Sequence, residues 1–250
     1  IIDEAMLKGS LYRKGDRIYA KSQYEAEVNI ATYLKDFPYV EMEPCDMSIM
    51  HGYLNDMEKD VGIQYDQLQK QAIDSFFDKP FSIITGGPGT GKTTVVRAMM
   101  KLFRMMYPNA TSMCVAPTGR AAKRLNEVTG TDSTTIHSFL KWDLETNSFG
   151  KNEEEPVDVD LLIIDEFSMV DSYLFSALVK AGKNIRKICL LGDEDQLPSV
   201  GPGCVLRDLI ASEKFPLVRL DHIYRQKSGS EVISLAHEIR TGSVNFEQYH

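Results

Sequence analysis

The segment from Gly86 to Thr93 constrains this chain of 250 residues more than any other part of it. Its sequence, GGPGTGKT, matches the phosphate-binding pattern G-x-x-x-x-G-K-[ST] in full. The apolar run 81–85 precedes it and a helical pattern follows to about Met106, which is the strand–loop–helix setting that the motif requires. A glycine-rich turn that matched by chance would explain neither flank. The segment therefore predicts a nucleoside triphosphate site on a P-loop NTPase fold.

The residue types indicate how this segment would hold phosphates. Glycines let backbone N–H groups curl around phosphate oxygens, and the N-terminus of the following helix adds a favourable dipole. Lys92 supplies a positive charge to the terminal phosphates, and the Thr93 hydroxyl can ligate Mg²⁺. The expected nucleotide-binding residues here are Gly86, Gly87, Pro88, Gly89, Thr90, Gly91, Lys92, Thr93 and Thr94.

Residues 65–250 alternate short apolar runs with helical patterns. The runs are rich in Val, Ile and Leu, as expected for strands buried on both faces, and the intervening helices would make crossover units. We therefore predict an α/β fold with a parallel sheet flanked by helices. Residues 141–159 interrupt the pattern and indicate an exposed loop or a hairpin insertion. The expected strands are 81–85, 112–116, 160–164, 187–191 and 217–220.

Residues 1–60 follow a different pattern and predict a small helix–hairpin–helix appendage to the domain at 61–250. A short helix would end at Gly9, a hairpin would turn at Lys14-Gly15-Asp16, and a second helix would stop before Pro38. The unit is either the wing and last helix of a winged-helix-like module that binds nucleic acid, or packing material. We favour packing.

The composition narrows the class of protein. The net charge of −8 argues against indiscriminate nucleic-acid binding but allows a local basic track. No apolar run approaches the ~20 residues that span a bilayer, so we expect no membrane association. The 4 cysteines form no C-x-x-C pair, which favours a reducing cytoplasm over a disulfide or zinc framework. The chain starts at Ile1 without a signal peptide, and we expect it to be a piece of a longer protein.

Two further strands end in polar residues that suit phosphate chemistry. The strand that ends before Asp165 and Glu166 would deliver both carboxylates to the edge of the sheet that carries the phosphate loop. Asp165 would hold Mg²⁺ and Glu166 would orient or deprotonate water, although the two could be solvated acids. After the strand 187–191, Gln196 can bond both a γ-phosphate and a neighbouring side chain, which suits a sensor of nucleotide state.

In this order, the motifs resemble those of RecD-like superfamily 1 DNA helicases, the family that includes the exodeoxyribonuclease V alpha subunit. The similarity covers roughly residues 60–240, and the segment before it also resembles the one that precedes the motor in longer bacterial members. Together the motifs are far more specific than any one of them. The matching segments are 65–73 (Q motif), 86–94 (motif I), 116–122 with 134–137 (motif Ia and the segment after it), 165–168 (motif II), 192–198 (motif III) and 220–226 (motif IV).

The resemblance implies a RecA-like motor that hydrolyses ATP with Mg²⁺ and moves along single-stranded DNA from 5′ to 3′, in DNA repair or recombination. It places adenine recognition at Gln69 and a γ-phosphate contact at Arg225. Thr93 and Asp165 are the expected metal ligands. The expected catalytic residues are Lys92, Asp165, Glu166, Gln196 and Arg225.

DNA contacts are expected at motif Ia, where Thr118 and backbone N–H groups can bind phosphates and Arg120, Lys123 and Arg124 add positive charge. The alternative is a helix start with a solvated face, and His137 is often a packed residue in such a setting. Packing is also the better interpretation of Trp142 and Tyr224. The expected DNA-binding residues are Pro117, Thr118, Gly119, Arg120, Thr135 and His137.

Motifs V and VI of the family's second RecA-like domain do not occur in this sequence. We therefore expect the chain to hold one wall of an ATP cleft and to need that second domain as a partner, beside single-stranded DNA and the subunits of a repair complex. Two other classes stay open from the residues alone. One is another P-loop enzyme, such as a kinase or a ring-forming ATPase, and the other is a non-catalytic module that binds a partner protein or DNA under the control of nucleotide.

Overall fold

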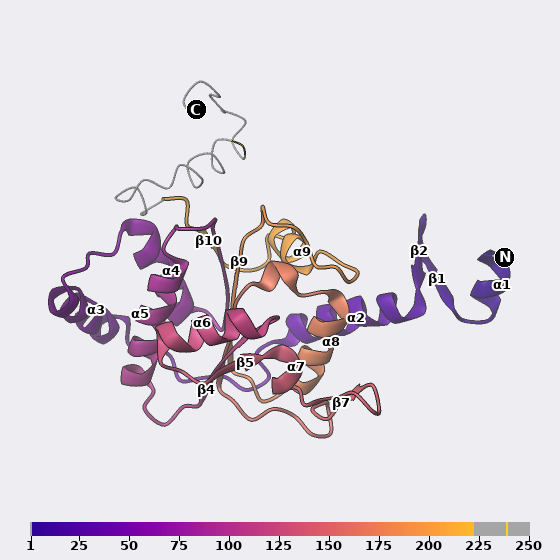
Figure 1. Ribbon diagram of the computed structural model, residues 1–250, viewed down its shortest axis with the longest axis horizontal. Coiled ribbons are helices and arrows are strands. Elements are labelled where there is room, and N and C mark those ends of the chain that lie inside the picture. Colours follow the sequence, from indigo (N-terminus) through magenta and orange to yellow (C-terminus); the bar gives the residue numbers. More distant parts are fainter. Residues whose placement is uncertain (1, 223–238, 240–250) are drawn as a thin grey trace.

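A six-stranded parallel sheet forms the centre of the protein, which we describe from a computed structural model that places residues 2–222 and 239 (Figure 1). The order of the strands across the sheet is β10-β3-β9-β8-β4-β5. Every neighbouring pair is parallel, so all six strands end at one edge. The strands are β3 (Phe81–Thr85), β4 (Ser112–Ala116), β5 (Ser133–Thr135), β8 (Leu161–Ile164), β9 (Lys187–Gly192) and β10 (Leu217–Arg219).

The five predicted strands all occur, and their bounds differ from the prediction by one residue at most. The strand β5 was not predicted. Its sequence is Ser-Thr-Thr, it lies at the edge of the sheet and its residues are only half-buried, so it has no apolar run by which a buried strand is recognised. The interruption at 141–159 contains a short hairpin of β6 (Trp142–Asp143) and β7 (Ser148–Phe149), which was one of the two expected alternatives.

Helices cover both faces of the sheet over two hydrophobic cores. Successive strand residues point to opposite faces, so Ile84 packs in one core and Ile83 in the other. The helices that flank the sheet are α4 (Gln67–Asp78), α5 (Lys92–Met106), α6 (Gly119–Thr129), α7 (Ile136–Phe139), α8 (Ser172–Ala181) and α9 (Val205–Ala211), and a 3₁₀ turn, η1 (Phe167–Met169), follows β8. The predicted parallel sheet with helices on both sides is confirmed.

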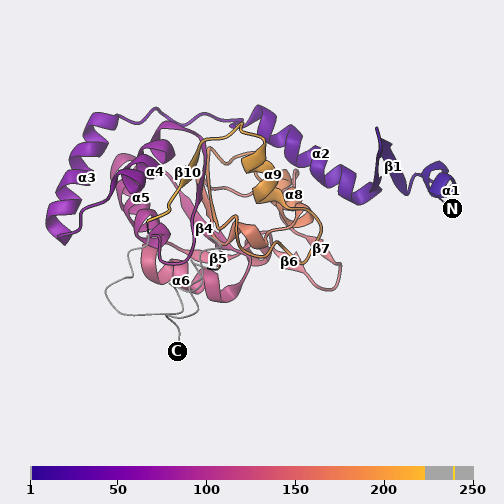
Figure 2. The same ribbon diagram turned by 90° about the horizontal axis from the view of Figure 1, so that it is seen from above.

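The N-terminal segment has the predicted order of helix, hairpin and helix, followed by one more helix. The hairpin and α1 lie at the far end of the molecule, away from the sheet (Figure 2). By contrast, α2 packs along α8, where the Tyr33 hydroxyl donates to the Gly182 carbonyl at 2.8 Å. The elements are α1 (Ile2–Leu7), β1 (Leu11–Lys14), β2 (Arg17–Ala20), α2 (Lys21–Asp36) and α3 (Met47–Val61).

The helix α3 belongs to the core on the other face of the sheet. Met50 and Leu54 are buried there against α4 and α5. Both α2 and α3 therefore take part in covering the sheet, and the division of the chain near residue 60 stays a prediction.

A buried lysine closes the end of α4. Lys187 at the start of β9 is only 4% exposed, and its Nζ donates to the carbonyl oxygens of Phe76 at 2.7 Å and Lys79 at 2.6 Å. These carbonyls lie at the helix C-terminus, where the helix itself leaves them unpaired and a positive charge is favourable. Burial lowers the pKa of Lys187 to about 8, which reflects the cost of placing its charge inside the protein.

Replacing this lysine should destabilise the fold. In Lys187→Met the apolar stem is kept but the carbonyls at the end of α4 lose their donor, so we expect the free energy of unfolding to fall by about 2–4 kcal/mol in urea denaturation. The matched control is Lys180→Met on the exposed side of α8, which should change it by less than about 0.5 kcal/mol. Equal stability of the two variants would contradict the capping role.

Candidate nucleotide-binding site

The loop between β3 and α5 has the backbone geometry of a phosphate cradle. Gly89 and Gly91 have φ of 83° and 87°, a region that side chains other than glycine rarely adopt. Gly91 precedes α5 and no side chain caps that helix, so its first N–H groups remain for a ligand. A Cβ at Gly86 would lie 2.5 Å from the Leu220 carbonyl oxygen and 2.7 Å from Thr90 Oγ1, so the start of the loop is tightly enclosed.

Lys92 lies folded back over this loop. Its Nζ donates to the carbonyl oxygens of Gly86 and, at 3.2 Å, of Gly87. The Thr90 hydroxyl also donates to Gly87 O, at 2.9 Å, and holds the turn closed. Burial lowers the pKa of Lys92, while the carboxylates of Asp193, Asp165 and Glu166 act against that shift. The ammonium group is thus held at the mouth of the cradle with acceptors that a phosphate can replace.

A cavity of about 670 Å³ opens beside the loop, within the size range of ligand pockets. It brings together predicted residues from four separate segments, namely the phosphate loop, the start of α4, the end of β8 and the loop after β9. The predicted residues that line it are Gln69, Gly87, Pro88, Gly89, Thr90, Gly91, Lys92, Thr93, Thr94, Asp165, Glu166 and Gln196.

Asp165 and Glu166 follow β8 directly and face Lys92. The Glu166 N–H donates to Asp165 Oδ1 at 2.8 Å, and Glu166 has a φ of 51°, a left-handed conformation that is uncommon outside glycine. Burial raises the pKa of Asp165. Burial also raises the pKa of Glu166, and the charge of Asp165 adds to the shift. A bound cation would act against both shifts.

The described residues contain no cluster of three or more His, Cys, Asp or Glu side chains that could hold a metal ion by itself. The Thr93 hydroxyl and the Asp165 carboxylate are hard oxygen donors in the same cavity. Such a sparse set fits Mg²⁺, because this ion is usually held by one or two carboxylates together with water and substrate phosphates.

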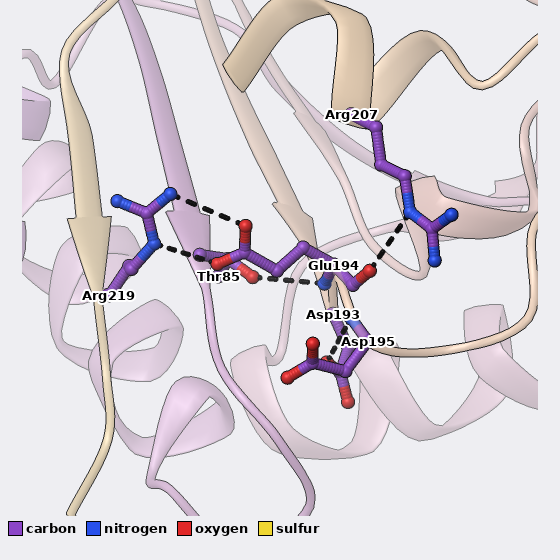
Figure 3. Close-up of polar contacts among 6 residues, drawn as sticks. All are labelled: Thr85, Asp193, Glu194, Asp195, Arg207 and Arg219. Atoms are coloured by element: carbon purple, nitrogen blue, oxygen red, sulfur yellow. Dashed lines mark hydrogen bonds and ion pairs between the residues drawn. The ribbon is translucent and has the colours of Figure 1, made fainter. Parts of the chain in front are cut away.

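The loop after β9 is fixed by contacts around Glu194 (Figure 3). Its N–H donates to Thr85 Oγ1 at 3.2 Å, and its carbonyl oxygen accepts from Arg207 Nε at 3.2 Å. Its carboxylate pairs with Arg219 on β10 at 2.7 and 3.3 Å. These contacts tie the loop to the end of β3, to α9 and to the edge strand.

Gln196 lies in the same loop, where Ser168 Oγ donates to its Oε1 at 3.4 Å. Ser168 belongs to η1, which directly follows Asp165 and Glu166. The neighbouring side chain expected for Gln196 is therefore Ser168, and the amide joins the two polar loops at the cavity.

Gln69 has a structural role as well as a place in the cavity. It is 4% exposed and forms a capping box with Asp66, in which Gln69 N donates to Asp66 Oδ1 at 2.8 Å and Asp66 N donates to Gln69 Oε1 at 3.1 Å. The capping box fixes the side chain at the start of α4 while the residue lines the cavity.

The expected DNA-binding residues lie apart from this cavity, along the starts of α6 and α7. Thr118 caps α6 by accepting from Ala121 N at 3.3 Å, and Thr135 caps α7 by accepting from Ser138 N at 3.1 Å. Next to Thr118 in the chain, Gly119 and Arg120 are exposed and Pro117 is half-buried. The hydroxyl groups of Thr118 and Thr135 already make local bonds, and DNA contact by this set stays a prediction.

His137 is exposed but packs against aromatic rings of the hairpin, with ring centroids 6.0 Å from Trp142 and 5.9 Å from Phe149. Trp142 and Phe149 also contact each other at 4.6 Å. The structure thus gives His137 and Trp142 the packed setting that was one interpretation of each. Tyr224 and Arg225 lie outside the described residues.

The sequence grouped Arg124 with Arg120 and Lys123 as a DNA-binding charge, but the structure places Arg124 at the nucleotide cavity. It lines that cavity with Leu125 and Val128 on the side of α6 that faces the phosphate loop. The exact rotation of α6 decides which exposed cation turns toward the cavity, and the local sequence does not specify it. The Glu194–Arg219 pair was also not expected, because it joins segments that only the sheet brings together.

A family model described as an AAA domain matches residues 69–202, which include the loop, both carboxylates and Gln196. The chain belongs to this family. It is 36% identical over 176 residues to the ATP-dependent RecD2 DNA helicase of Deinococcus radiodurans, covering 70% of this chain and 24% of that protein. It is 35% identical over 163 residues to the RecBCD enzyme subunit RecD of Haemophilus influenzae, covering 56% of this chain and 26% of that protein.

These similarities confirm the resemblance to RecD-like superfamily 1 helicases. The chain spans about a quarter of the length of these two relatives, 24% and 26%. Among solved structures, the Pif1 helicase from Candida albicans is 25% identical, with a TM-score of 0.56 over 74% of this chain and 46% of that one. The chain therefore shares its RecA-like fold with the structure of a helicase. None of the helices in the described part of this chain is both long and apolar enough to span a membrane.

The enclosure of Gly86 yields a prediction for this AAA domain. Gly86→Ala places a methyl group against backbone and should lower the free energy of unfolding by about 1–3 kcal/mol, measured by urea denaturation. Binding of a fluorescent ATP analogue should weaken at least about tenfold, since the loop must shift. Gly52→Ala in α3 is the control because nothing lies within 4 Å of its Cβ, and it should leave binding unchanged. A fully stable Gly86→Ala that binds normally would contradict the enclosure.

Proposed function

We propose that this chain is the first RecA-like motor domain of an ATP-dependent DNA helicase, which couples hydrolysis of ATP to movement along single-stranded DNA. The observation that carries the proposal is the convergence of Lys92, Asp165, Glu166 and Gln196 on one cavity beside the phosphate loop. A kinase would not need the sensor loop after β9, and the similarity to RecD and RecD2 helicases supports the motor.

The residues of the cavity divide the chemistry among them. Lys92 neutralises charge on the terminal phosphates, and Glu166 accepts a proton from the attacking water. Thr93 and Asp165 would hold Mg²⁺, which supplies positive charge to the phosphates. Gln69 is proposed to recognise the adenine, because it lines the cavity and the capping box fixes its position.

Gln196 is proposed as the sensor of the γ-phosphate, and the resemblance adds Arg225, which lies outside the described residues. Through Ser168 and the contacts of Glu194, a change at Gln196 reaches both the carboxylate loop and the edge strand β10. The sensor loop is thus connected to the loop that carries the proposed catalytic carboxylates.

The DNA is proposed to lie across the starts of α6 and α7, over Pro117, Thr118, Gly119, Arg120, Thr135 and His137. Exposed backbone at Gly119 and the charge of Arg120 suit contacts to phosphates that do not depend on base sequence. Movement from 5′ to 3′, a role in repair or recombination, and a place in the cytoplasm are what the resemblance and the composition suggest. A second RecA-like domain and repair-complex subunits are the proposed partners.

Nucleotide binding tests the site directly. In Lys92→Ala we expect the affinity for a fluorescent ATP analogue to fall at least about tenfold, since a half-buried charge proposed to face the phosphates is removed. Circular dichroism should show an unchanged fold. Wild-type affinity in the folded variant would exclude the assignment of Lys92.

Turnover tests the motor. In a protein that carries this domain together with a second RecA-like domain, Glu166→Gln should lower the rate of ATP hydrolysis by about 10²–10⁴-fold while ATP still binds. Wild-type hydrolysis should increase when single-stranded DNA is added. If the protein hydrolyses ATP at the same rate with and without DNA, it is an ATPase that is not coupled to DNA, and the helicase proposal is contradicted.

A further inference from the structure

Arg124 is a cation at the nucleotide cavity that has no role in the proposed hydrolysis. It is exposed on α6 and lines the same cavity as the phosphate loop. Within the described part of the chain it makes no hydrogen bond and no ion pair, whereas Arg104, Arg186, Arg207 and Arg219 each have a polar partner there. An unpaired guanidinium at a cavity is available to a ligand.

The helix holds Arg124 in this position. Ala122 and Leu125 are buried and anchor α6 against the sheet and α5. Arg124 precedes Leu125 and lies one turn from Val128, and these three residues form the α6 side of the cavity. Because the backbone of α6 is packed, the guanidinium can reach the cavity without a rearrangement of the fold.

A triphosphate bound in this cavity would need a cation in addition to Lys92, and Arg124 lines the same cavity. Burial is the main cause of the pKa shifts of Asp165, Glu166 and Lys92, and the positive charge of Arg124 is a smaller influence that acts to lower the pKa of each. Those carboxylates and Asp193 leave Lys92 outnumbered by negative groups. A triphosphate adds further negative charge, and a guanidinium can bond two phosphate oxygens at once.

We propose that Arg124 is a second cation of the phosphate site and contacts the terminal phosphate of the bound nucleoside triphosphate, a role that rests on the proposed function. The contact distinguishes a triphosphate from a diphosphate. It also links the two ligands, because the same helix carries Arg120 and the Thr118 cap of the proposed DNA-binding segment. Loss of the terminal phosphate would release Arg124, in the middle of α6, from its ligand.

The test is equilibrium binding of fluorescent ATP and ADP analogues to this chain. Arg124→Ala should weaken binding of the triphosphate at least tenfold and of the diphosphate less than twofold, so the preference for the triphosphate falls. Arg124→Lys should recover part of the loss, because it restores a charge without the paired donors. Lys101→Ala, which removes an exposed cation from α5 away from the cavity, should match the wild type.

The outcomes separate this proposal from the proposed function. If Lys92→Ala weakens nucleotide binding and Arg124→Ala does not, the site stands and the role of Arg124 is wrong. Equal losses for the two nucleotides in Arg124→Ala would likewise exclude a contact with the terminal phosphate. If the wild-type chain binds neither nucleotide, the proposed function fails and the role of Arg124 fails with it.

Discussion

The parallel pairing of β3, β9 and β8 is the constraint on which the site depends. Thr85 pairs with Gly192 and Ile164 with Leu190, so the three strands reach the same edge of the sheet within a residue or two of each other. The phosphate loop, Asp165-Glu166 and the sensor loop follow directly from these ends. The Gly86 N–H donates to the Gly192 carbonyl oxygen at 3.2 Å, which extends the pairing into the loops themselves. A shift of one strand would separate groups that must meet at one phosphate.

Burial gives these groups their chemical character. Lys92, Asp165 and Glu166 share a partly buried site, where charges interact more strongly than in water and each carboxyl group resists ionisation. A bound cation and phosphate would change the ionisation of all three groups together. Strand β9 has a buried charged residue at each end. Lys187 begins the strand and closes α4, and Asp193 follows the strand beside the phosphate site.

Much of this could be predicted from the sequence because the signals are local. Buried strands appear as apolar runs, and the glycine-rich loop carries its own geometry in Gly89 and Gly91. The strand β5 escaped because its three residues are polar. Gln69 was expected at the nucleotide, but its capping box with Asp66 shows that the same side chain also starts α4.

The sequence by itself determined the parallel α/β core, the phosphate loop and the carboxylate and sensor segments, since each follows from residue types at short spacing. The tertiary structure decided which distant groups meet. It turned Arg124 toward the nucleotide cavity, joined Glu194 to Arg219 and placed Ser168 against Gln196. The physical reason is that helix rotation and strand order depend on the packing of the two cores, whose contacts are long-range and leave no mark in any one segment.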